Sequence, residues 1–352
     1  MHSRNLEPFW REKPNTKAQI TVIIVNYNSG RYIRSCLEAL SNQEFADFQA
    51  VVVDNASTDD SLSLCQGFDE RFSFVPLRRN LGFAAANNLV AFATTSPWIA
   101  TLNPDAIPTD RWLSQLVAAV SRYAGVAMFG STQIKDSTRL TLDGVGDVYS
   151  FCGMVWRGYH NHPLSDLPED GEVFSPCAAA ALYRADVFRL AGGFDERFFC
   201  YCEDLDLAFR IRLLGHRCIQ VRDAEVYHVG SESSGRHSDF AVYHGFRNRL
   251  WTYVKDMPSP LFQLLLFPHL AATLCHIFYE AAQGRGKPAW KGVRDAILGL
   301  SKMWASRSLI QRSRRESVIG IARAMCWSPL KILARAHDLR PPKEKGPMGA
   351  SG

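Results

Sequence analysis

Apolar runs without polar alternation recur in the first third of the chain with helical stretches between them, and this pattern constrains the fold most. Such runs, rich in β-branched residues, are typical of strands buried in a parallel sheet. The runs interpreted as strands are Ile20–Val25, Ala50–Val53, Phe72–Val75 and Trp98–Leu102. Helices are expected over residues 31–42 and 83–93, the first with one apolar stripe of Ile33, Cys36, Leu37 and Leu40. Repeated strand–helix alternation predicts a doubly wound, mostly parallel α/β sheet.

Polar residues stand where three of these expected strands end. Asn26 and Asp54 follow the first two runs, and Asp105 follows the fourth in the sequence Asn103-Pro104-Asp105. In open sheets of this kind, ligands bind beyond the carboxyl ends of the strands. The sequence therefore predicts a binding site at this edge. Just after Asp54, Ser57 is expected to be the N-cap of a short helix, with an acid three residues further on.

The following part of the chain is less regular. Residues 130–175 are rich in Gly, Asp and aromatic residues, which predicts irregular hairpins and loops. A strand is expected over Ala178–Tyr183. A helix is expected to follow the acidic residues 203–206, because Leu207, Ile211 and Leu214 share one helical face and Gly215 is a fitting stop at C′.

Charge is distributed unevenly along the 352 residues. From residue 284 to the end there are 15 Lys and Arg against 4 Asp and Glu, a net charge of +11. Because the whole chain carries +5, the remainder carries −6. An acidic body with a basic tail predicts that the tail faces an anionic surface, either membrane or nucleic acid. The tail carries no recognised nucleic-acid-binding signature, so we expect no nucleic acid partner.

Residues 260–282 are mostly apolar and near the length of a membrane span. The polar residues Gln263, His269 and His276 interrupt the stretch, which favours an interfacial or re-entrant segment over a clean span. Three tryptophans further along the basic tail also favour a seat at a membrane surface. The alternative is a helical subdomain packed on the body.

The nine cysteines form no Cys-x-x-Cys pair, and their number is odd. Both features favour a reducing compartment. Residues 1–14 contain no apolar segment of the signal-peptide type, so no signal peptide is expected. Together with the basic tail, this predicts a protein on the cytoplasmic face of the inner membrane, peripheral or monotopic.

Several residues at the expected sheet edge have the chemistry of a nucleotide and metal site. Tyr27 can stack on a base and Asp54 can accept the imide N–H of uracil or thymine, although Asp54 alone can equally be the acid of a capping turn. Asp105 suits Mg²⁺ or Mn²⁺, which take one or two carboxylates together with substrate phosphates. The alternative for Asp105 is a turn acid next to proline. His228 can add an imidazole ligand, or it can be a satisfied core histidine.

The acidic cluster Glu203-Asp204-Leu205-Asp206 opens a helix, where the dipole favours carboxylates. Asp206 and Arg210 have the spacing of an i,i+4 ion pair. Three crowded acids repel one another, so one of them can keep a raised pKa suited to a general base.

Other nucleotide-dependent classes lack their motifs. No GxGxxG follows the first strand, which argues against a nicotinamide-linked oxidoreductase, and no GxxxxGK[ST] occurs for a P-loop phosphotransferase. A processive polysaccharide synthase would need several long membrane spans. A catalytically inactive sugar-nucleotide-binding protein is the main alternative to an enzyme, and the presence of Asp54, Asp105, Asp204 and His228 together argues against it.

Six motifs, in one order over residues 20–255, carry a resemblance to a family. They are VIIVNYNSG, VVVDNASTDDS, NLGFAAANN, LNPDA, GGFDERFFCYCEDLDLAFRIRLLG and AEVYHVGS. The chain resembles the family 2 GT-A glycosyltransferases, and within them the rhamnosyltransferase-like enzymes of bacterial cell-envelope polysaccharide assembly.

The resemblance implies the GT-A fold, displacement with inversion, and a metal-dependent reaction in which Asp204 is the catalytic base. It implies a Mg²⁺ or Mn²⁺ ion at Asp105 and His228, with Asp54 at the nucleobase. On the nucleotide side it places Asn80, Gly82 and Asn87, and on the acceptor side Gly193, Phe194, Asp195 and Glu203. The metal motif of the family is often Asp-x-Asp, whereas here its first position is Asn103, whose carbonyl can contact ribose or a water.

The resemblance favours a dTDP-rhamnose donor, with a UDP-hexose next, and a lipid-linked saccharide as acceptor. The resemblance implies a GT-A domain (19–255), preceded by an N-terminal extension (1–18). Composition indicates a basic helical membrane-associated region (256–340) and a disordered tail (341–352). Within the GT-A domain, residues 19–130 form the nucleotide-sugar half and residues 131–255 the acceptor half. Arg247-Asn248 also matches the subgroup, without an assigned role.

Overall fold

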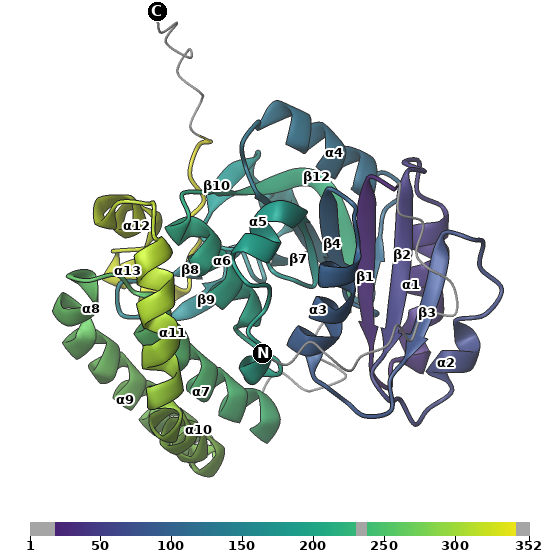
Figure 1. The fold of residues 1–352 in the computed structure, drawn as a ribbon. Coiled ribbons are helices and arrows are strands. Elements are labelled where there is room, and N and C mark those ends of the chain that lie inside the picture. Colours follow the sequence, from purple (N-terminus) through teal and green to yellow (C-terminus); the bar gives the residue numbers. More distant parts are fainter. Residues whose placement is uncertain (1–17, 230–237, 343–352) are drawn as a thin grey trace, which may run out of the picture.

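A ten-stranded sheet crosses the protein in the computed structural model, which describes residues 18–229 and 238–342. Eight strands lie in the order β10-β12-β6-β11-β4-β1-β2-β3, while β5 pairs with β12 and β7 with β6 (Figure 1). A separate hairpin joins β8 to β9. The strands are β1 (Ile20–Asn26), β2 (Phe48–Asp54), β3 (Phe72–Pro76), β4 (Trp98–Leu102), β5 (Ala106–Pro108), β6 (Met128–Lys135), β7 (Leu142–Gly144), β8 (Asp147–Tyr149), β9 (Val155–Arg157), β10 (Gly171–Val173), β11 (Ala180–Arg184) and β12 (Cys218–His228).

The four strands expected from apolar runs form the parallel part of the sheet, in the order β3-β2-β1-β4. Every residue of β1, β2 and β4 is buried. The helices of this part are α1 (Gly30–Ser41), α2 (Ser61–Leu64), α3 (Phe83–Ala93) and α4 (Trp112–Arg122). The buried residues of α1 are those of the predicted stripe, so sheet packing selects the apolar face that the sequence offers. The doubly wound α/β prediction is confirmed.

One prediction in this part is wrong. Ser57 is not a helix N-cap, because α2 begins at Ser61, with Asp60 at its N-cap position. The Ser57 hydroxyl instead accepts hydrogen bonds from the side chain of Asn26 and the backbone N–H of Asn28. The serine therefore joins the turn after β2 to the end of β1.

The middle region contains short hairpins, as expected, but also the eight-residue strand β6, which the sequence did not indicate. β6 lies inside the sheet between β11, which is antiparallel to it, and β12, which is parallel. Its buried residues include the polar Ser131, Thr132 and Gln133. A buried strand without an apolar run has no hydrophobic signature, so the pattern could not predict it.

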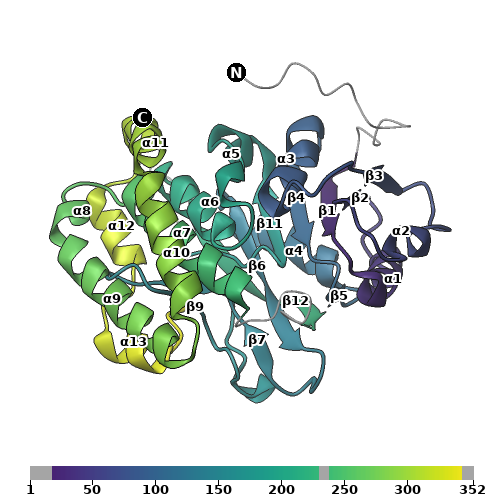
Figure 2. The ribbon, with the colours of Figure 1, turned by 90° about the horizontal axis from the view of Figure 1, so that it is seen from below.

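The carboxyl-terminal part is helical and packs beside the sheet (Figures 1 and 2). In the second half of the chain the helices are α5 (Ala185–Leu190), α6 (Glu203–Leu213), α7 (Asp239–Asp256), α8 (Leu261–Leu264), α9 (Leu266–Ala282), α10 (Gly286–Leu298), α11 (Leu300–Ser313), α12 (Val318–Ala324) and α13 (Pro329–Ala334). Gly215 follows the end of α6 with a φ of +94°, which confirms the predicted stop. Within the described residues, no helix has both the length and the apolar character needed to cross a membrane.

The expected division at residue 130 falls inside β6, and β11 of the second half pairs with β4 of the first. One continuous sheet therefore serves both halves of the domain. The expected extension over residues 1–18 and tail over 341–352 lie almost entirely outside the described residues.

Candidate active site

The ends of β1 and β2 meet at the carboxyl edge of the sheet, where Asn26 lies in register with Asp54. The Asn26 amide donates to one carboxylate oxygen of Asp54 (2.7 Å) and also to the hydroxyl of Ser61 (2.8 Å). Asp54 is 5% exposed and also accepts the backbone N–H of Ser57. Its carboxylate therefore organises the turn, while the neighbouring Tyr27 is 47% exposed and free to stack. The nucleobase role of Asp54 stays a prediction.

A polar loop beside this edge contains the expected nucleotide-side residues. The side chain of Asn80 accepts the N–H of Gly82, and Asn55 accepts the N–H of Leu81. Gly82 has a φ of +84°, and a Cβ atom there would lie 2.5 Å from the ring of Phe199. Only glycine fits this contact, which joins the nucleotide-side loop to the loop that precedes Asp204.

The other asparagines are tied to the scaffold. Asn87 is fully buried in α3 and donates to the carbonyl of Phe83, while its own side-chain oxygen has no hydrogen-bond partner in residues 18–229 and 238–342. The backbone N–H of Asn103 donates to the carbonyl of Ala179, and its carbonyl accepts the N–H of Ala106. Asn103 therefore joins the end of β4 to the turn that contains Asp105.

Asp105 and His228, far apart in the sequence, lie together because β12 pairs with β5. The Nε2 atom of His228 is 3.5 Å from a carboxylate oxygen of Asp105, and both residues are buried. The other ring nitrogen, Nδ1, lies 2.8 Å from a carboxylate oxygen of Asp143. A carboxylate on one side of an imidazole is the arrangement that fixes the tautomer of a metal-binding histidine.

These residues fit a divalent ion that completes its coordination with substrate. Among the described residues, the buried Nε2 atom of His228 has no hydrogen-bond partner, and the Asp105 carboxylate lies beside it. Within residues 18–229 and 238–342, no group of three or more His, Cys, Asp or Glu side chains is arranged to hold a metal by itself. Mg²⁺ and Mn²⁺ commonly use one or two protein ligands and take the others from water and phosphates.

A chain of charged groups continues from His228 towards Asp204. The guanidinium of Arg157 forms an ion pair with Asp143 and also hydrogen-bonds to the thiol of Cys177. Burial and the negative charge of Asp204 raise the pKa of Asp147 to about 7. The positive charge of Arg157 lowers the pKa of both Asp147 and Asp204, against the effect of burial.

Asp204 is partly buried at the first turn of α6. One of its carboxylate oxygens accepts the N–H of Ala178 (3.0 Å), and the other accepts the N–H of Leu205 (2.8 Å). Burial raises the pKa of Asp204, while these N–H groups and Arg157 partly offset the rise. The result is a carboxylate held in one orientation with increased basicity.

Glu203 differs from its neighbour. It is 6% exposed, and its Oε2 atom has no hydrogen-bond partner within the part of the chain that the structure describes. Burial and the nearby charge of Asp204 raise the pKa of Glu203 well above its usual range. Burial therefore favours the protonated form more strongly for Glu203 than for Asp204, which makes Asp204 the better candidate for the base.

The loop before Asp204 has an unusual backbone. Phe199, Tyr201 and Cys202 all have positive φ angles of 61–68°, although none of them is glycine. Such conformations cost free energy and persist only where surrounding contacts enforce them.

The enforcing contacts come from α7 and explain the paired residues Arg247 and Asn248. The fully buried side-chain amide of Asn248 donates to the carbonyls of Phe198 (3.0 Å), Cys200 (2.9 Å) and Tyr201 (2.7 Å). Arg247 also donates to the carbonyl of Phe198 (2.9 Å). These side chains hold the loop that orients Asp204.

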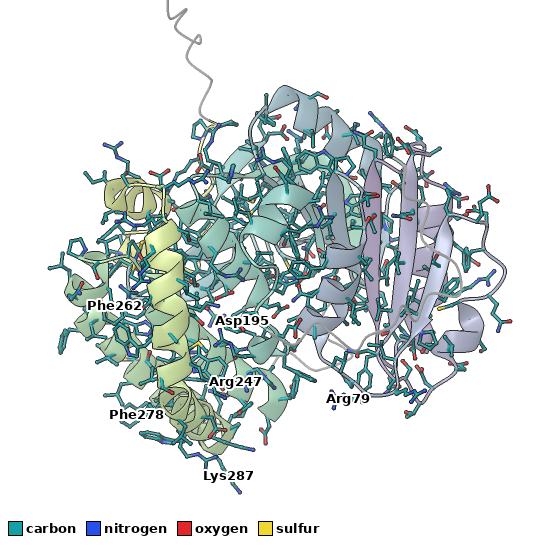
Figure 3. The ribbon with its side chains drawn as sticks, in the orientation of Figure 1. Arg79, Asp195, Arg247, Phe262, Phe278 and Lys287 are labelled. Atoms are coloured by element: carbon teal, nitrogen blue, oxygen red, sulfur yellow. The ribbon has the colours of Figure 1, made fainter. Side chains whose placement is uncertain are left out.

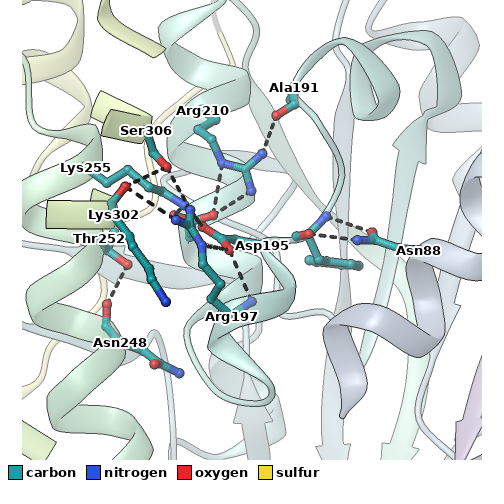
Figure 4. A network of polar contacts seen from close by, with 12 residues as sticks. Asn88, Ala191, Asp195, Arg197, Arg210, Asn248, Thr252, Lys255, Lys302 and Ser306 are labelled. Carbon is teal, nitrogen blue, oxygen red and sulfur yellow. Dashed lines mark hydrogen bonds and ion pairs between the residues drawn. The ribbon is translucent and has the colours of Figure 1, made fainter. Parts of the chain in front are cut away.

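The expected acceptor-side residues form part of a buried network (Figure 4). The Asn88 side chain bonds both the N–H and the carbonyl of Phe194, which follows Gly193, a glycine with a φ of +67°. Asp195 forms ion pairs with Arg197 (2.6 Å) and Lys255 (2.7 Å). Its carboxylate therefore links α7 to the segment before α6, and its role on the acceptor side stays a prediction.

The same network contains the predicted ion pair between Asp206 and Arg210, with 2.5 Å between charged atoms. Lys255, 1% exposed, also contacts Asp206. Asp206 is therefore not available as a base, because Arg210 and Lys255 already compensate its charge.

Sequence reasoning missed Asp143, Asp147 and Arg157. They lie on the three-residue strands β7, β8 and β9, which have no periodic pattern. The only available signal was the density of charged residues in an otherwise glycine-rich region.

The sheet and its polar carboxyl edge define an α/β protein of the nucleotide-binding type. Residues 21–190 match the model of glycosyl transferase family 2, and this part of the chain is a family 2 glycosyltransferase domain. The chain is similar to the N-acetylglucosaminyl-diphospho-decaprenol L-rhamnosyltransferase of Mycobacterium tuberculosis (strain ATCC 25618 / H37Rv). The two are 26% identical over 251 residues, which cover 64% of this chain and 81% of the relative.

Solved structures share the fold. TarS 1–349 of S. aureus has a TM-score of 0.55 at 15% identity and covers 93% of this chain and 97% of its own. The mannosyltransferase PcManGT from Pyrobaculum calidifontis, in complex with GDP-Man and Mn²⁺, has a TM-score of 0.52 at 18% identity, with 90% of each chain covered. These likenesses confirm the GT-A fold.

Proposed function

We propose that the protein is a metal-dependent, inverting glycosyltransferase that moves a sugar from a nucleoside diphosphate to a lipid-linked saccharide in cell-envelope glycan synthesis. The first donor candidate is dTDP-rhamnose, supported by the similar rhamnosyltransferase, whose name specifies a diphospho-decaprenol-linked acceptor. A UDP-hexose donor is the second candidate. The observation that carries the proposal is the charged chain that connects Asp105 and His228 to Asp204 through Asp143 and Arg157.

The residues divide the work of a single displacement. Asp204 accepts the proton of the acceptor hydroxyl as its oxygen bonds to the anomeric carbon of the donor sugar. The bond from that carbon to the diphosphate breaks on the opposite side, and the nucleoside diphosphate leaves. A divalent ion at Asp105 and His228 would neutralise charge on the leaving diphosphate. In this proposal, Tyr27 and Asp54 hold the base.

Two supporting observations concern the cation and the compartment. PcManGT, which shares the fold, was solved with Mn²⁺. All nine cysteines of this chain are unpaired thiols, which supports a proposal that the enzyme works on the cytoplasmic face of the inner membrane.

The test is a donor panel of dTDP-rhamnose, UDP-hexoses and GDP-mannose with Mg²⁺ or Mn²⁺. Metal-dependent release of the nucleoside diphosphate with a lipid-linked acceptor is expected for one donor, and loss of release in Asp105→Ala. Donor binding without turnover for every member of the panel would favour a catalytically inactive sugar-nucleotide-binding protein.

A further inference from the structure

The polar and apolar sides of helix α9 are reversed relative to those of an ordinary surface helix. A helix on the surface of a water-soluble protein turns its apolar side to the core and its polar side to solvent. The residues of α9 that are buried against the body are His269, Thr273, Ile277 and Glu280, three of them polar. The helix thus presents its polar side to the protein.

The body contacts two of these polar side chains, and Glu280 pairs with Arg285 just after the helix. His269 stacks on Tyr253 at 3.9 Å between ring centroids, and its Nδ1 atom lies 3.0 Å from the carbonyl of Cys152. Arg249 donates to the hydroxyl of Thr273. Because each contact is specific, the observed rotation of α9 about its axis is fixed, and the apolar side must face outward.

The outward side is a continuous apolar stripe. It begins with Leu264 of α8 (69% exposed) and continues with Phe267 (80%), Leu270 (53%), Leu274 (48%) and Phe278 (66%). The spacing of three and four residues keeps the α9 members on one helix face. Residues 257–279 include no Asp, Glu, Lys or Arg. We refer to these five side chains as the α9 stripe; an exposed apolar patch of this kind marks an interaction site.

Basic and aromatic residues lie on α10, the helix that packs beside α9. Lys287 and Lys291 of α10 are exposed, and Trp290 between them is 57% exposed. Phe278 and Lys287 both project from the outer edge of the carboxyl-terminal helices (Figure 3). Lysine and tryptophan beside an apolar helix face are the residues that favour the headgroup region of an anionic bilayer.

We infer that the α9 stripe enters the outer acyl layer of an anionic lipid bilayer, with α9 parallel to the membrane plane and the α10 lysines at the headgroups. The inference rests on the proposed function for its purpose, because a lipid-linked acceptor is presented at a membrane surface. A second copy of the chain is the less suitable occupant. A two-fold interface over the stripe would bring the exposed lysines of α10 in the two copies towards each other, and these like charges repel.

The test uses the full chain and liposomes of phosphatidylethanolamine with phosphatidylglycerol, compared with pure phosphatidylcholine. The double variant Phe267→Gln/Phe278→Gln should lose about tenfold in vesicle partitioning for each phenylalanine, because each loses the transfer free energy of a large apolar side chain. Lys287→Gln and Lys291→Gln should each cost about fivefold on anionic vesicles only. The matched control is Leu140→Gln/Leu190→Gln, which changes two exposed apolar residues outside the stripe and should bind as the wild type does.

All substituted side chains are already exposed, and circular dichroism checks the fold. Equal vesicle binding by wild type and Phe267→Gln/Phe278→Gln would overturn the inference, as would a wild-type dimer that does not bind vesicles and that the same variant converts to a monomer. Donor turnover with a short-chain, water-soluble acceptor separates the two proposals. If turnover persists without vesicle binding, the membrane surface is misassigned and the proposed function stands. If the protein binds vesicles but turns over no donor, the membrane surface stands and the proposed function is wrong.

Discussion

Replacing Asp204 by Asn tests the catalytic base most directly, and the structure sets two expected magnitudes. Loss of a general base lowers the transfer rate by about 10²–10⁴. The substitution also has a structural cost, because the two carboxylate oxygens accept the N–H groups of Ala178 and Leu205. An asparagine can accept only one of these bonds and presents its own NH₂ group to the other donor. A hydrogen bond to a charged group contributes about 1.5–3 kcal/mol.

The variant is therefore expected to lose that much stability, with a fall in Tm of about 2–4 °C for each kcal/mol in a domain of this size. It should nevertheless remain folded. The assay compares the transfer rate under saturating donor with the donor dissociation constant measured by calorimetry. Only the rate should collapse, because Asp204 takes no part in holding the donor in the proposed mechanism.

Glu203→Gln is the matched control. Because burial raises the pKa of Glu203 and so favours its neutral form, glutamine resembles the favoured form of the native side chain. The variant should transfer at a rate within a few-fold of the wild type. Full activity in Asp204→Asn combined with loss in Glu203→Gln would show that the base is Glu203, and two active variants would refute carboxylate catalysis at this cluster.

Three further outcomes follow from the same geometry. Asp143→Asn should weaken Mn²⁺ binding, measured by electron paramagnetic resonance, by about 10–100-fold, whereas the exposed control Asp186→Asn should not. Asn248→Ala removes three hydrogen bonds to the loop before Asp204, so kcat should fall at least tenfold while the donor dissociation constant is unchanged; a fall in both would indicate general unfolding. Above about pH 4.3 the unfolded chain releases a proton that folded Glu203 keeps. The contribution of Glu203 to the free energy of unfolding therefore falls as pH rises. Urea titrations at pH 5 and 8 should show a smaller fall in that free energy for Glu203→Gln than for the wild type.

The parallel half of the sheet could be predicted because burial on both faces demands uninterrupted apolar strands. The predicted and observed bounds of β4 and α3 agree, and β1 differs by one residue. Asp105 and His228 were expected together only through the family resemblance. Their proximity depends on the pairing of β5 with β12, and no local pattern encodes a pairing between distant segments.

The rest of the site could not be predicted for a related reason. Arg157 and Asp143 act through tertiary contacts between three-residue strands, where neither periodicity nor capping rules apply. Asn248 was visible as a motif, yet its role depends on the positive φ angles of the loop that it holds. The α9 stripe was anticipated only as an apolar segment, since the face that packs inward is decided by partners such as Arg249 and Tyr253.

Asp143 connects the two halves of the proposed reaction. One carboxylate contacts both the imidazole of His228 and the guanidinium of Arg157. The first contact orients the side chain proposed to hold the cation at the leaving group. The second holds the positive charge that offsets the raised pKa of Asp204 on the acceptor side. The same buried acid therefore contacts His228 directly and acts on Asp204 through the charge of Arg157, so removing it should disturb cation binding and proton acceptance together.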